Sequence, residues 1–340
     1  MGFTEWTNVG KAQKLFWNHY QPKVPADLGY YDLRYPEIRQ QQAELAKKSG
    51  IEGFCYYHYW FGNGKQELEY PLQQIVELKE PDFPFCICWA NQSWYSKFWN
   101  NDIAASPKLI AEQQYDNDEG IKKHFYSLLS AFKDDRYIKI DGKLVFMIYR
   151  PLEYPDVKNF MAIWQSLARQ HNLSAFHFVG QAVSDSDTNK ILQLGFDAVN
   201  IVRKDDFLKQ PRYSNIVSRT LKKAQRTFGF HPITTTMLKY QNIFIGGVET
   251  NENVYPTLIP NWDHSPRSGK RAVVFTNSTP DNFKKHALDV IDVVKNKNNK
   301  IVFLKSWNEW GEGNYMEPDL KYGHGYIDAL RQVLSEASTL

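Results

Sequence analysis

Two spacings of apolar residues alternate along the chain from residue 33 to the C-terminus. Where apolar side chains recur every three to four residues, the spacing predicts helices. These are Leu33–Lys48, Leu68–Leu78, Asp118–Lys133, Val157–His171, Thr188–Leu194, Pro280–Val294 and Tyr326–Glu336. Short apolar runs between them predict strands at Ile51–His58, Phe83–Trp89, Leu144–Tyr149, Ala175–Val183, Phe196–Val202, Val254–Ile259 and Ile301–Ser306. Such alternation of strands and helices is typical of a parallel sheet.

The strand pattern favours a (β/α)₈ TIM-type barrel, although it yields about seven strands, one fewer than a closed barrel contains. An open, doubly wound sheet is the alternative architecture. No predicted strand is followed by the glycine-rich phosphate turn of dinucleotide- or nucleotide-binding folds, which favours the barrel. A basic helix at Ser214–Phe228 and a threonine-rich segment interrupt the alternation. We therefore predict one domain over residues 1–340 with an insertion at about 203–250, between the last strands.

Composition narrows the class of partner and the compartment. The 41 basic and 38 acidic residues give a net charge of +3, which leaves no electrostatic footprint for nucleic acid. Cys55, Cys86 and Cys88 lack disulfide or metal spacing and indicate reduced thiols in the cytoplasm. There is no leader and no apolar run long enough to span a bilayer. We expect a cytoplasmic protein without metal or cofactor, compatible with peripheral association with membrane-bound glycan assembly proteins.

Aromatic residues make up 15% of the chain, and many of them lie with polar partners just after predicted strands. The carboxyl ends of barrel strands carry the active site in this fold. Aromatic rings pack on the C–H faces of sugars, and amides, carboxylates and guanidinium groups bind hydroxyls. The candidate substrate-binding residues are His58, Trp60, Trp89, Asn91, Trp94, Tyr149, Arg150, Asp263, Arg267, Trp307, Asn308, Trp310 and Glu317. Together they predict an oligosaccharide or polysaccharide substrate.

The sharpest signal is a pair of carboxylates after the last strand. Glu309 and Glu312 lie three residues apart in the sequence WNEWGEG, with glycines that permit a tight turn. Two neighbouring carboxyl groups take different pKa values, which supplies one acid and one base. Retaining glycosidases hold their carboxyl groups about 5 Å apart. We therefore predict that this pair is catalytic. The alternative is a structural glutamate that supports the turn or pairs with Arg267 or Arg150.

Two further acidic features are weaker. The triplet Asp185-Ser186-Asp187 is similar to the Asp-x-Asp that holds a metal and a nucleotide diphosphate, but it fits a helix cap better. Glu249 is an additional candidate for the pocket.

The motifs at these positions resemble the WbsX-type family, whose members occur with bacterial O-antigen and capsule genes and are related to endo-α-mannosidase barrels. The matching segments cover nearly the whole chain. They are GFTEWTNV (2–9), HYQP (19–22), DLGYYDLR (27–34), GFCYYHYWF (53–61), PDFPFCICWAN (81–91), RYIKIDGKLVFMIYRP (136–151), WNEWGEG (307–313) and EPD (317–319).

The resemblance implies that Glu309 and Glu312 match the catalytic glutamates of the endo-α-mannosidases. There, one carboxylate acts as a base on the sugar 2-hydroxyl to give an epoxide-like intermediate, and the other is the acid for the leaving oxygen. On this basis we assign Glu309 as base or stabiliser and Glu312 as acid and later base. Family members begin with another strand before the GFTEW segment, whereas this chain starts at Met1. The expected fold is thus a barrel whose first strand is missing.

Two functions follow from these observations. The first is an enzyme that makes or breaks a glycosidic bond of a bacterial surface polysaccharide, as a WbsX-type glycosyltransferase or with retaining endo-glycosidase chemistry. The second is a non-catalytic glycan-binding barrel in a polysaccharide assembly complex. The two differ in whether the glutamate pair is needed for turnover or only for the shape of the site.

Overall fold

A computed structural model describes residues 4–96, 108–205, 234–236, 245–269 and 272–338. Its strands are β1 (Phe54–Trp60), β2 (Gln66–Glu67), β3 (Phe85–Trp89), β4 (Trp94–Tyr95), β5 (Leu109–Ala111), β6 (Lys139–Ile140), β7 (Lys143–Ile148), β8 (Phe176–Ala182), β9 (Ala198–Ile201), β10 (Thr234–Thr236), β11 (Val254–Tyr255), β12 (Thr257–Leu258), β13 (Val274–Thr276), β14 (Phe303–Leu304), β15 (Asn308–Glu309) and β16 (Asn314–Tyr315). The α-helices are α1 (Glu5–Lys11), α2 (Pro36–Ser49), α3 (Tyr70–Leu78), α4 (Asp118–Phe132), α5 (Val157–Gln170), α6 (Asp185–Gln193), α10 (Ser265–Ser268), α11 (Pro280–Val294) and α12 (Gly325–Ser338). Short 3₁₀ helices are η1 (Pro151–Glu153), η2 (Arg203–Asp205), η4 (Val248–Thr250) and η6 (Trp310–Glu312).

The main strands pair in parallel and follow one another in chain order. The order is β1-β3-β7-β8-β9-β11, and β12, which follows β11 directly, pairs in parallel with β14. A doubly wound sheet reverses its strand order at one point, whereas this order does not reverse. The doubly wound alternative is therefore wrong, and the strands are arranged as in a barrel. Within the described residues, no ladder joins β14 to β1, so the ring of strands is not closed.

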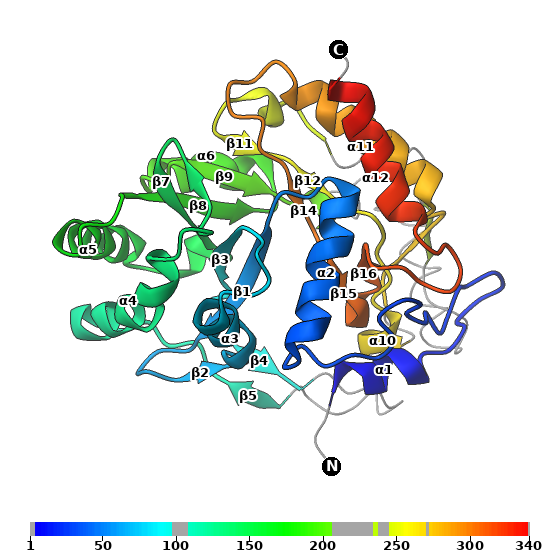
Figure 1. Cartoon of the computed structure of the whole chain (residues 1–340), viewed down its shortest axis with the longest axis horizontal. Helices are drawn as coiled ribbons and strands as arrows, with labels where there is room; N and C mark the ends of the chain where they lie inside the picture. Colours follow the sequence, from blue (N-terminus) through cyan, green and yellow to red (C-terminus); the bar gives the residue numbers. More distant parts are fainter. Residues whose placement is uncertain (1–3, 97–107, 206–233, 237–244, 270–271, 339–340) are drawn as a thin grey trace, which may run out of the picture.

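Helices cover the outside of the strands, as Figure 1 shows for the neighbouring pairs α4 and α5, and α11 and α12. The central strands are buried on both faces: every residue of Phe85–Trp89 is buried, as expected of parallel strands between two apolar layers. By contrast, most residues of β1 and both residues of β14 are only partly buried.

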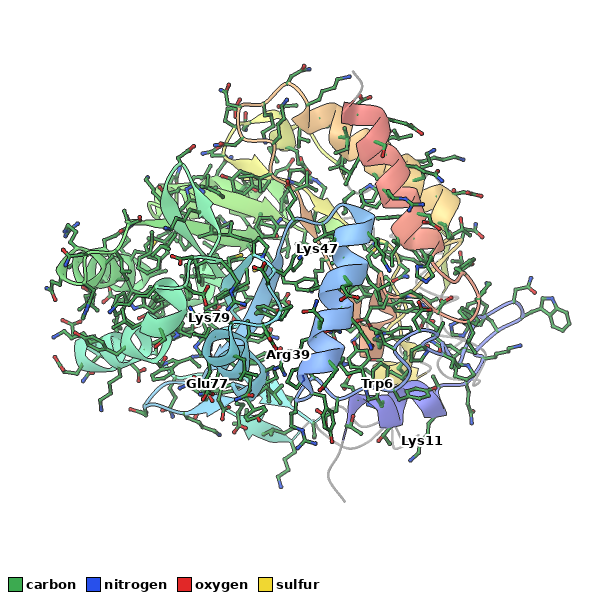
Figure 2. The ribbon with its side chains drawn as sticks, in the orientation of Figure 1. Trp6, Lys11, Arg39, Lys47, Glu77 and Lys79 are labelled. Atoms are coloured by element: carbon green, nitrogen blue, oxygen red, sulfur yellow. The ribbon has the colours of Figure 1, made fainter. Side chains whose placement is uncertain are left out.

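Helix α2 packs where β1 and β14 face each other without a ladder. Its residues Ala43 and Ala46 share an apolar cluster with Trp307, and Phe54 of β1 packs against that cluster. Arg39, labelled on α2 in Figure 2, connects the helix to the segment before it, because it donates from Nη1 to the carbonyl oxygen of Leu33 at 2.7 Å. Side chains, rather than backbone hydrogen bonds, thus connect the two edges of the sheet.

Within the described residues, the structure has each of the predicted helices and strands, with bounds that shift by a few residues. Helix α2 ends where Gly50 takes φ +88°, a left-handed conformation that glycine adopts without steric cost. Short hairpins such as β4–β5 and β15–β16 were not predicted, because ladders of two or three residues carry no periodicity. Most of the predicted insertion, including Ser214–Phe228, lies outside the described residues, and the insertion stays a prediction.

Candidate active site

The two glutamates lie on a short hairpin after β14. Strands β15 and β16 pair antiparallel, with Glu309 opposite Asn314, and η6 forms the turn between them. Gly311 packs so closely that a Cβ atom there would lie 1.7 Å from Oε2 of Glu5 and 2.9 Å from Nε of Arg267. A side chain at this position would therefore displace Glu5 or Arg267 from their present contacts. Gly313 takes φ +54°, and a Cβ there would lie 2.7 Å from Cβ of Asp263.

One guanidinium group holds three carboxylates. Arg267, on α10, donates from Nη2 to Glu309 Oε1 at 2.6 Å and from Nη1 to Glu312 Oε1 at 2.7 Å. Its Nε donates to Oε2 of Glu5 on α1 at 2.7 Å. Within the described part of the chain, Oε2 of Glu309 and Oε2 of Glu312 accept no hydrogen bond. The arrangement fixes the two glutamates beside each other and leaves one oxygen of each for a ligand.

The surroundings shift the pKa values of the pair in opposite directions. Burial raises the pKa of Glu309, and this effect exceeds the opposing effect of Arg267. Burial would also raise the pKa of Glu312, but a hydrogen bond with His264 and the charge of Arg267 outweigh it and hold that pKa well below its usual range. His264 Nε2 lies 3.5 Å from Glu312 Oε1. Glu309 is therefore the more readily protonated carboxyl group of the pair, and Glu312 the more readily ionised one.

Aromatic side chains from β1 and from the segments after β3 and β7 line the same side. Burial, followed by the charge of Glu309, raises the pKa of Tyr59, which places this phenol near that carboxylate. The Tyr59 ring packs edge to face against Trp94 at 4.9 Å between centroids. Tyr57 and Tyr149 make a similar contact at 6.0 Å. These rings provide apolar faces beside the glutamates.

A buried lysine completes the charged cluster. Lys305, which directly follows β14, donates from Nζ to the hydroxyl oxygen of Tyr57 at 3.1 Å. Its positive charge opposes the rise in the pKa of Glu309 and contributes to the lowering of the pKa of Glu312. The cluster therefore combines cations from two strand ends with the glutamate pair.

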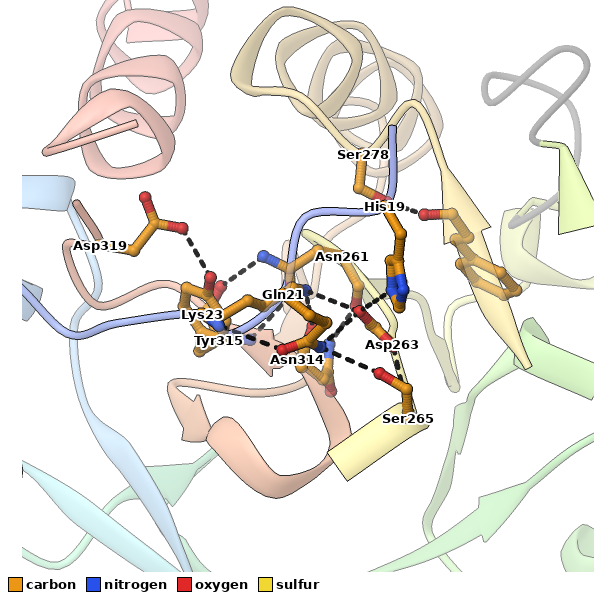
Figure 3. Close-up of polar contacts among 12 residues, drawn as sticks. His19, Gln21, Lys23, Asn261, Asp263, Ser265, Ser278, Asn314, Tyr315 and Asp319 are labelled. Atoms are coloured by element: carbon orange, nitrogen blue, oxygen red, sulfur yellow. Dashed lines mark hydrogen bonds and ion pairs between the residues drawn. The ribbon is translucent and has the colours of Figure 1, made fainter. Parts of the chain in front are cut away.

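An N-terminal strap anchors the loop that carries Arg267. His19 Nε2 and Gln21 Nε2 lie 2.8 and 2.7 Å from Oδ2 of Asp263, and Gln21 also donates to Ser265 Oγ at 3.0 Å, as Figure 3 shows. The backbone N–H of Asp263 donates to the carbonyl oxygen of Glu312 at 2.8 Å. The carboxylate of Asp263 is thus occupied by protein groups, and the residue positions the glutamate hairpin instead of facing the mouth of the sheet.

Three of the candidate sugar-binding residues lie on the opposite face of their strands. His58 Nε2 is 3.0 Å from Nε2 of His124 on α4, and the Trp60 ring stacks on His124 at 4.7 Å between centroids. Trp89 donates from Nε1 to the carbonyl oxygen of Trp60 at 2.9 Å. Successive side chains of a strand alternate between faces, so these residues pack against the helical layer while Tyr57 and Tyr59 face inward. The structure does not bring the three to the glutamates.

Two other candidates are occupied by protein partners. Asn91 is buried, donates from Nδ2 to the carbonyl oxygen of Arg150 at 3.0 Å and accepts from its backbone N–H at 2.7 Å. It therefore shapes the loop after β7. Arg150 itself lies over the Tyr149 ring, 5.0 Å from the centroid, at the edge of the aromatic side. Glu317 is buried and accepts from Tyr31, Gln42 and Trp310; the distances are 2.8, 2.6 and 2.6 Å.

The remaining candidates flank the hairpin. The Trp310 ring stacks on Tyr315 at 3.8 Å between centroids and is buried. Trp307 packs against Phe54 at 5.7 Å. Asn308 is the partly buried first residue of β15, next to Glu309. These side chains support the shape of the hairpin, and Asn308 directly precedes Glu309 in the sequence.

The weaker acidic features have structural roles. Ser184 caps α6, accepting from the backbone N–H of Asp187, and Asp185 pairs with Arg203 at 2.6 Å. Arg203 also pairs with the buried carboxylate of Glu249. The triplet therefore lies at the start of a helix, as its interpretation as a cap requires, but the capping residue is Ser184 and the triplet forms the first turn. Glu249 lies outside the glutamate cluster. Among the described residues, no group of three or more histidine, cysteine, aspartate or glutamate side chains has metal-binding geometry. No described helix is both long and apolar enough to cross a membrane.

Sequence reasoning missed Glu5, Tyr57, Tyr59 and Lys305 as members of the site. Glu5 belongs to the GFTEW segment, far from any predicted strand end. Lys305 was the one charged residue of an otherwise apolar strand, a signal that pointed to a buried partner.

Solved structures with the same fold are glycoside-hydrolase-like. A glycoside hydrolase-like protein superimposes with a TM-score of 0.61 at 15% identity, covering 94% of this chain and 92% of its own. The GH99 endo-alpha-mannosidase from Bacteroides thetaiotaomicron gives a TM-score of 0.54 at 13% identity, covering 93% of this chain and 84% of its own. At such identities the likeness shows the fold alone. The chain thus has the α/β fold of the glycoside-hydrolase-like barrels.

Sequence comparison defines the class of this protein more specifically than the fold does. The family model described as glycosyltransferase WbsX matches residues 1–330, and the chain belongs to this family, which confirms the resemblance of its motifs. The WxcX proteins of two strains of Xanthomonas campestris pv. campestris are each 29% identical over 340 residues. The match covers 99% of this chain and 47% of those proteins. The chain therefore spans about half the length of the curated relatives it matches.

Proposed function

We propose that this chain makes or breaks a glycosidic bond in a bacterial surface polysaccharide, with Glu309 and Glu312 as the catalytic pair. The observation that carries the proposal is the shared contact of both carboxylates with Arg267. Because both bind one planar guanidinium, they lie close together, as the carboxyl groups of retaining glycosidases do at about 5 Å. Family membership and the glycoside-hydrolase-like fold support the same class of chemistry.

The pKa directions favour an exchange of the roles assigned from the sequence. The raised pKa of Glu309 suits the acid that protonates the leaving oxygen, and the lowered pKa of Glu312 suits the carboxylate that acts on the sugar. In the epoxide-like route, Glu312 removes the proton of the 2-hydroxyl, whose oxygen attacks C1 as the bond to the leaving oxygen breaks. Glu309 then takes a proton from the incoming water or sugar hydroxyl as its oxygen attacks C1, and Glu312 returns its proton to the 2-oxygen as the epoxide opens.

The aromatic side of the site fits a sugar ring. Tyr59 lies near Glu309 and packs against Trp94, and Tyr149 packs against Tyr57, which lies on the same strand as Tyr59. Aromatic rings pack on the C–H bonds of pyranoses. The acceptor, water or a sugar hydroxyl, decides between hydrolase and transferase. Both reactions use the same two carboxylates, so the proposal covers both.

A non-catalytic glycan-binding module is the second candidate. The observation that favours it is that Arg267 already neutralises both carboxylates, as in a structural ion-pair cluster. In that case the hairpin would present Asn308 and the aromatic rings to a glycan without turnover.

Product analysis by mass spectrometry separates these functions. The protein and its Glu309→Gln and Glu312→Gln variants are incubated with surface oligosaccharide of the producing strain, with and without sugar-nucleotide or lipid-linked donors. Glu77→Gln, an exposed change on α3 (Figure 2), is the matched control. We expect shortened oligosaccharides without donor, or lengthened ones with it, and a loss of at least about a hundredfold in both pair variants.

Each outcome has a distinct meaning. Product that forms equally in the wild type and in both pair variants would contradict the catalytic assignment. Glycan binding without product in the wild type, unchanged in Glu309→Gln and Glu312→Gln, would establish the binding module. If the protein neither binds the oligosaccharide nor forms product from it, the carbohydrate function itself is refuted.

A further inference from the structure

Two tight turns carry the two most exposed large apolar side chains among the described residues. Trp17 is 91% exposed and Leu320 is 70% exposed. Trp17 lies in the turn 16–19, which a backbone hydrogen bond of 3.1 Å closes, and Leu320 lies in the turn 319–323, which one of 2.8 Å closes. Folding leaves both side chains in water, although burying such side chains is favourable. Gathered on one surface, exposed apolar side chains mark a site for a partner.

The turn that carries Trp17 is fixed to the candidate active site. Leu15 and His19, on either side of its tip, are buried. The Nδ1 atom of His19 accepts from the backbone N–H of Leu15 at 3.0 Å, so its Nε2 carries the proton and donates to Oδ2 of Asp263 at 2.8 Å. The Phe16 ring stacks on the His19 ring at 4.4 Å between centroids. The fold therefore holds the Trp17 indole outward on a rigid support.

The second turn packs against the segment that follows the first. The backbone N–H of Leu320 donates to the carbonyl oxygen of Val24 at 3.0 Å. Lys321 Nζ lies 4.7 Å from the centroid of the Tyr20 ring, and that ring lies 6.4 Å from the ring of Tyr322. Figure 1 shows that the loop between α1 and α2, in dark blue, protrudes from the body of the molecule. The two turns thus belong to one protruding surface.

Positive charge surrounds the two turns. Lys11 ends α1, Lys14 lies between α1 and the first turn, and Lys321 lies in the second turn; all three are exposed. Figure 2 shows Lys11 at the outer edge of the molecule. The segment 6–26 contains no acidic residue. The exposed apolar side chains therefore have a basic rim.

The nearest acidic residues in the sequence are bound by protein groups. Glu5 pairs with Arg267 at 2.7 Å, and Asp27 pairs with His324 at 2.7 Å. Asp319 is buried and accepts hydrogen bonds from protein groups. These contacts direct the three carboxylates away from the basic rim and leave the charge of the lysines to a partner.

We propose that the two turns dock the protein on a lipid bilayer with anionic headgroups. Trp17 and Leu320 insert at the level of the headgroups, where indole rings are favoured. Lys11, Lys14 and Lys321 are attracted by the negative surface of the bilayer. The inference goes beyond the proposed function and does not depend on it. Docking brings the glutamate hairpin to the membrane surface, because the first turn is anchored beside it.

Co-sedimentation with vesicles tests this docking without requiring turnover. The purified chain is mixed with sucrose-loaded vesicles of phosphatidylcholine alone, or of phosphatidylcholine and phosphatidylglycerol in equal parts. Each lysine near an anionic surface tightens binding about fivefold. We therefore expect the anionic vesicles to bind about ten to a hundred times more tightly than the neutral ones. The preference should weaken as sodium chloride rises.

Aromatic variants identify the inserted side chain. Trp17→Ala should weaken binding to the anionic vesicles at least about tenfold, because burial of a large apolar side chain is lost, and Trp17→Phe should retain part of the binding. Tyr126→Ala, a half-exposed aromatic on α4, is the matched control. Brominated lipids should quench more tryptophan fluorescence in the wild type than in Trp17→Phe.

Lysine variants test the charge. The double variant Lys11→Gln/Lys14→Gln should lose about ten- to thirtyfold in binding to the anionic vesicles. The double variant Lys122→Gln/Lys123→Gln, on α4, removes the same charge elsewhere and should bind like the wild type. Thermal melts check that each variant is folded.

The outcomes separate this inference from the proposed function. Absence of binding, equal binding to neutral and anionic vesicles, or unchanged binding of Trp17→Ala would overturn the docking. If surface oligosaccharide binds and Trp17→Ala weakens that binding, while vesicles do not bind, the turn belongs to a glycan site and the docking is also overturned. Glu309→Gln should bind vesicles like the wild type, so loss of turnover and loss of docking are measured independently.

Discussion

Replacing Arg267 with glutamine tests whether one guanidinium holds the whole cluster together. The side chains of Arg267, Glu309 and Glu312 are only 17%, 27% and 16% exposed, so the variant leaves two neighbouring carboxylates poorly solvated. Each charge-assisted hydrogen bond contributes about 1.5–3 kcal/mol. The contact of Arg267 with Glu5 contributes less than about 1 kcal/mol, because the Glu5 side chain is 43% exposed and screened by solvent.

The contacts of Arg267 with Glu309 and Glu312 therefore determine how much stability the variant loses. Removing one partner of a buried ion pair costs about 3–5 kcal/mol. At about 2 °C per kcal/mol for a domain of this size, the Tm at pH 7.5 should fall by about 6–10 °C. Differential scanning calorimetry measures this loss. Arg331→Gln, which breaks the exposed pair of Arg331 with Asp328, is the control and should change the Tm by less than about 2 °C.

The pH dependence distinguishes lost charge from lost packing. In the wild type, the pKa of Glu312 is lowered, so its stabilisation is present above the unfolded pKa and is lost as pH falls. In Arg267→Gln, the guanidinium no longer opposes burial at Glu309, so the pKa of Glu309 rises further above its unfolded value. Glu312 loses one of the effects that lower its pKa, while His264 and Lys305 still act on it. The folded variant then gains protons and stability as pH falls towards about 4.5. The Tm difference from wild type should therefore shrink between pH 7.5 and pH 4.5, and a constant difference would refute the electrostatic explanation.

Two further changes test the supports of the cluster. Gly311→Ala places a Cβ 1.7 Å from Glu5 Oε2 and 2.9 Å from Arg267 Nε, so Glu5 and Arg267 must move away from it. Because Arg267 holds both glutamates, we expect turnover to fall at least about tenfold with a small change in Tm, and unchanged kinetics would contradict this. Asp263→Asn removes a carboxylate whose pKa is about 2, because His19 and Lys23 outweigh the raising effect of burial. It removes the carboxylate that lies 3.9 Å from the buried Lys23 Nζ and leaves Asp319 as the acidic neighbour of that lysine. Calorimetry should show a loss of about 3–5 kcal/mol; a loss below about 1 kcal/mol would mean that Asp263 does not stabilise the segment around His19 and Gln21.

The sequence predicted the scaffold better than the orientation of side chains on it. Long periodic segments such as Pro280–Val294 were placed at their observed bounds, because an apolar face and a Thr279 cap both define them. In β1, by contrast, both rows are aromatic, Tyr57 and Tyr59 on one face and His58 and Trp60 on the other. Alternation separates the rows but does not say which one faces inward, since burial of both removes the polar contrast on which that choice depends.

The N-terminal segment explains why strand ends alone gave an incomplete site. Glu5 reaches Arg267 from α1, and the strap at His19 and Gln21 fixes Asp263, which in turn holds the glutamate hairpin through Glu312. Those partners lie 242 to 262 residues apart in the chain, beyond the reach of any local spacing. A parallel sheet gathers its own loops at one end, but contacts from outside the sheet depend on how the first residues pack across it. The two glutamates could therefore be proposed from spacing, while the groups that set their charge states could only be seen in three dimensions.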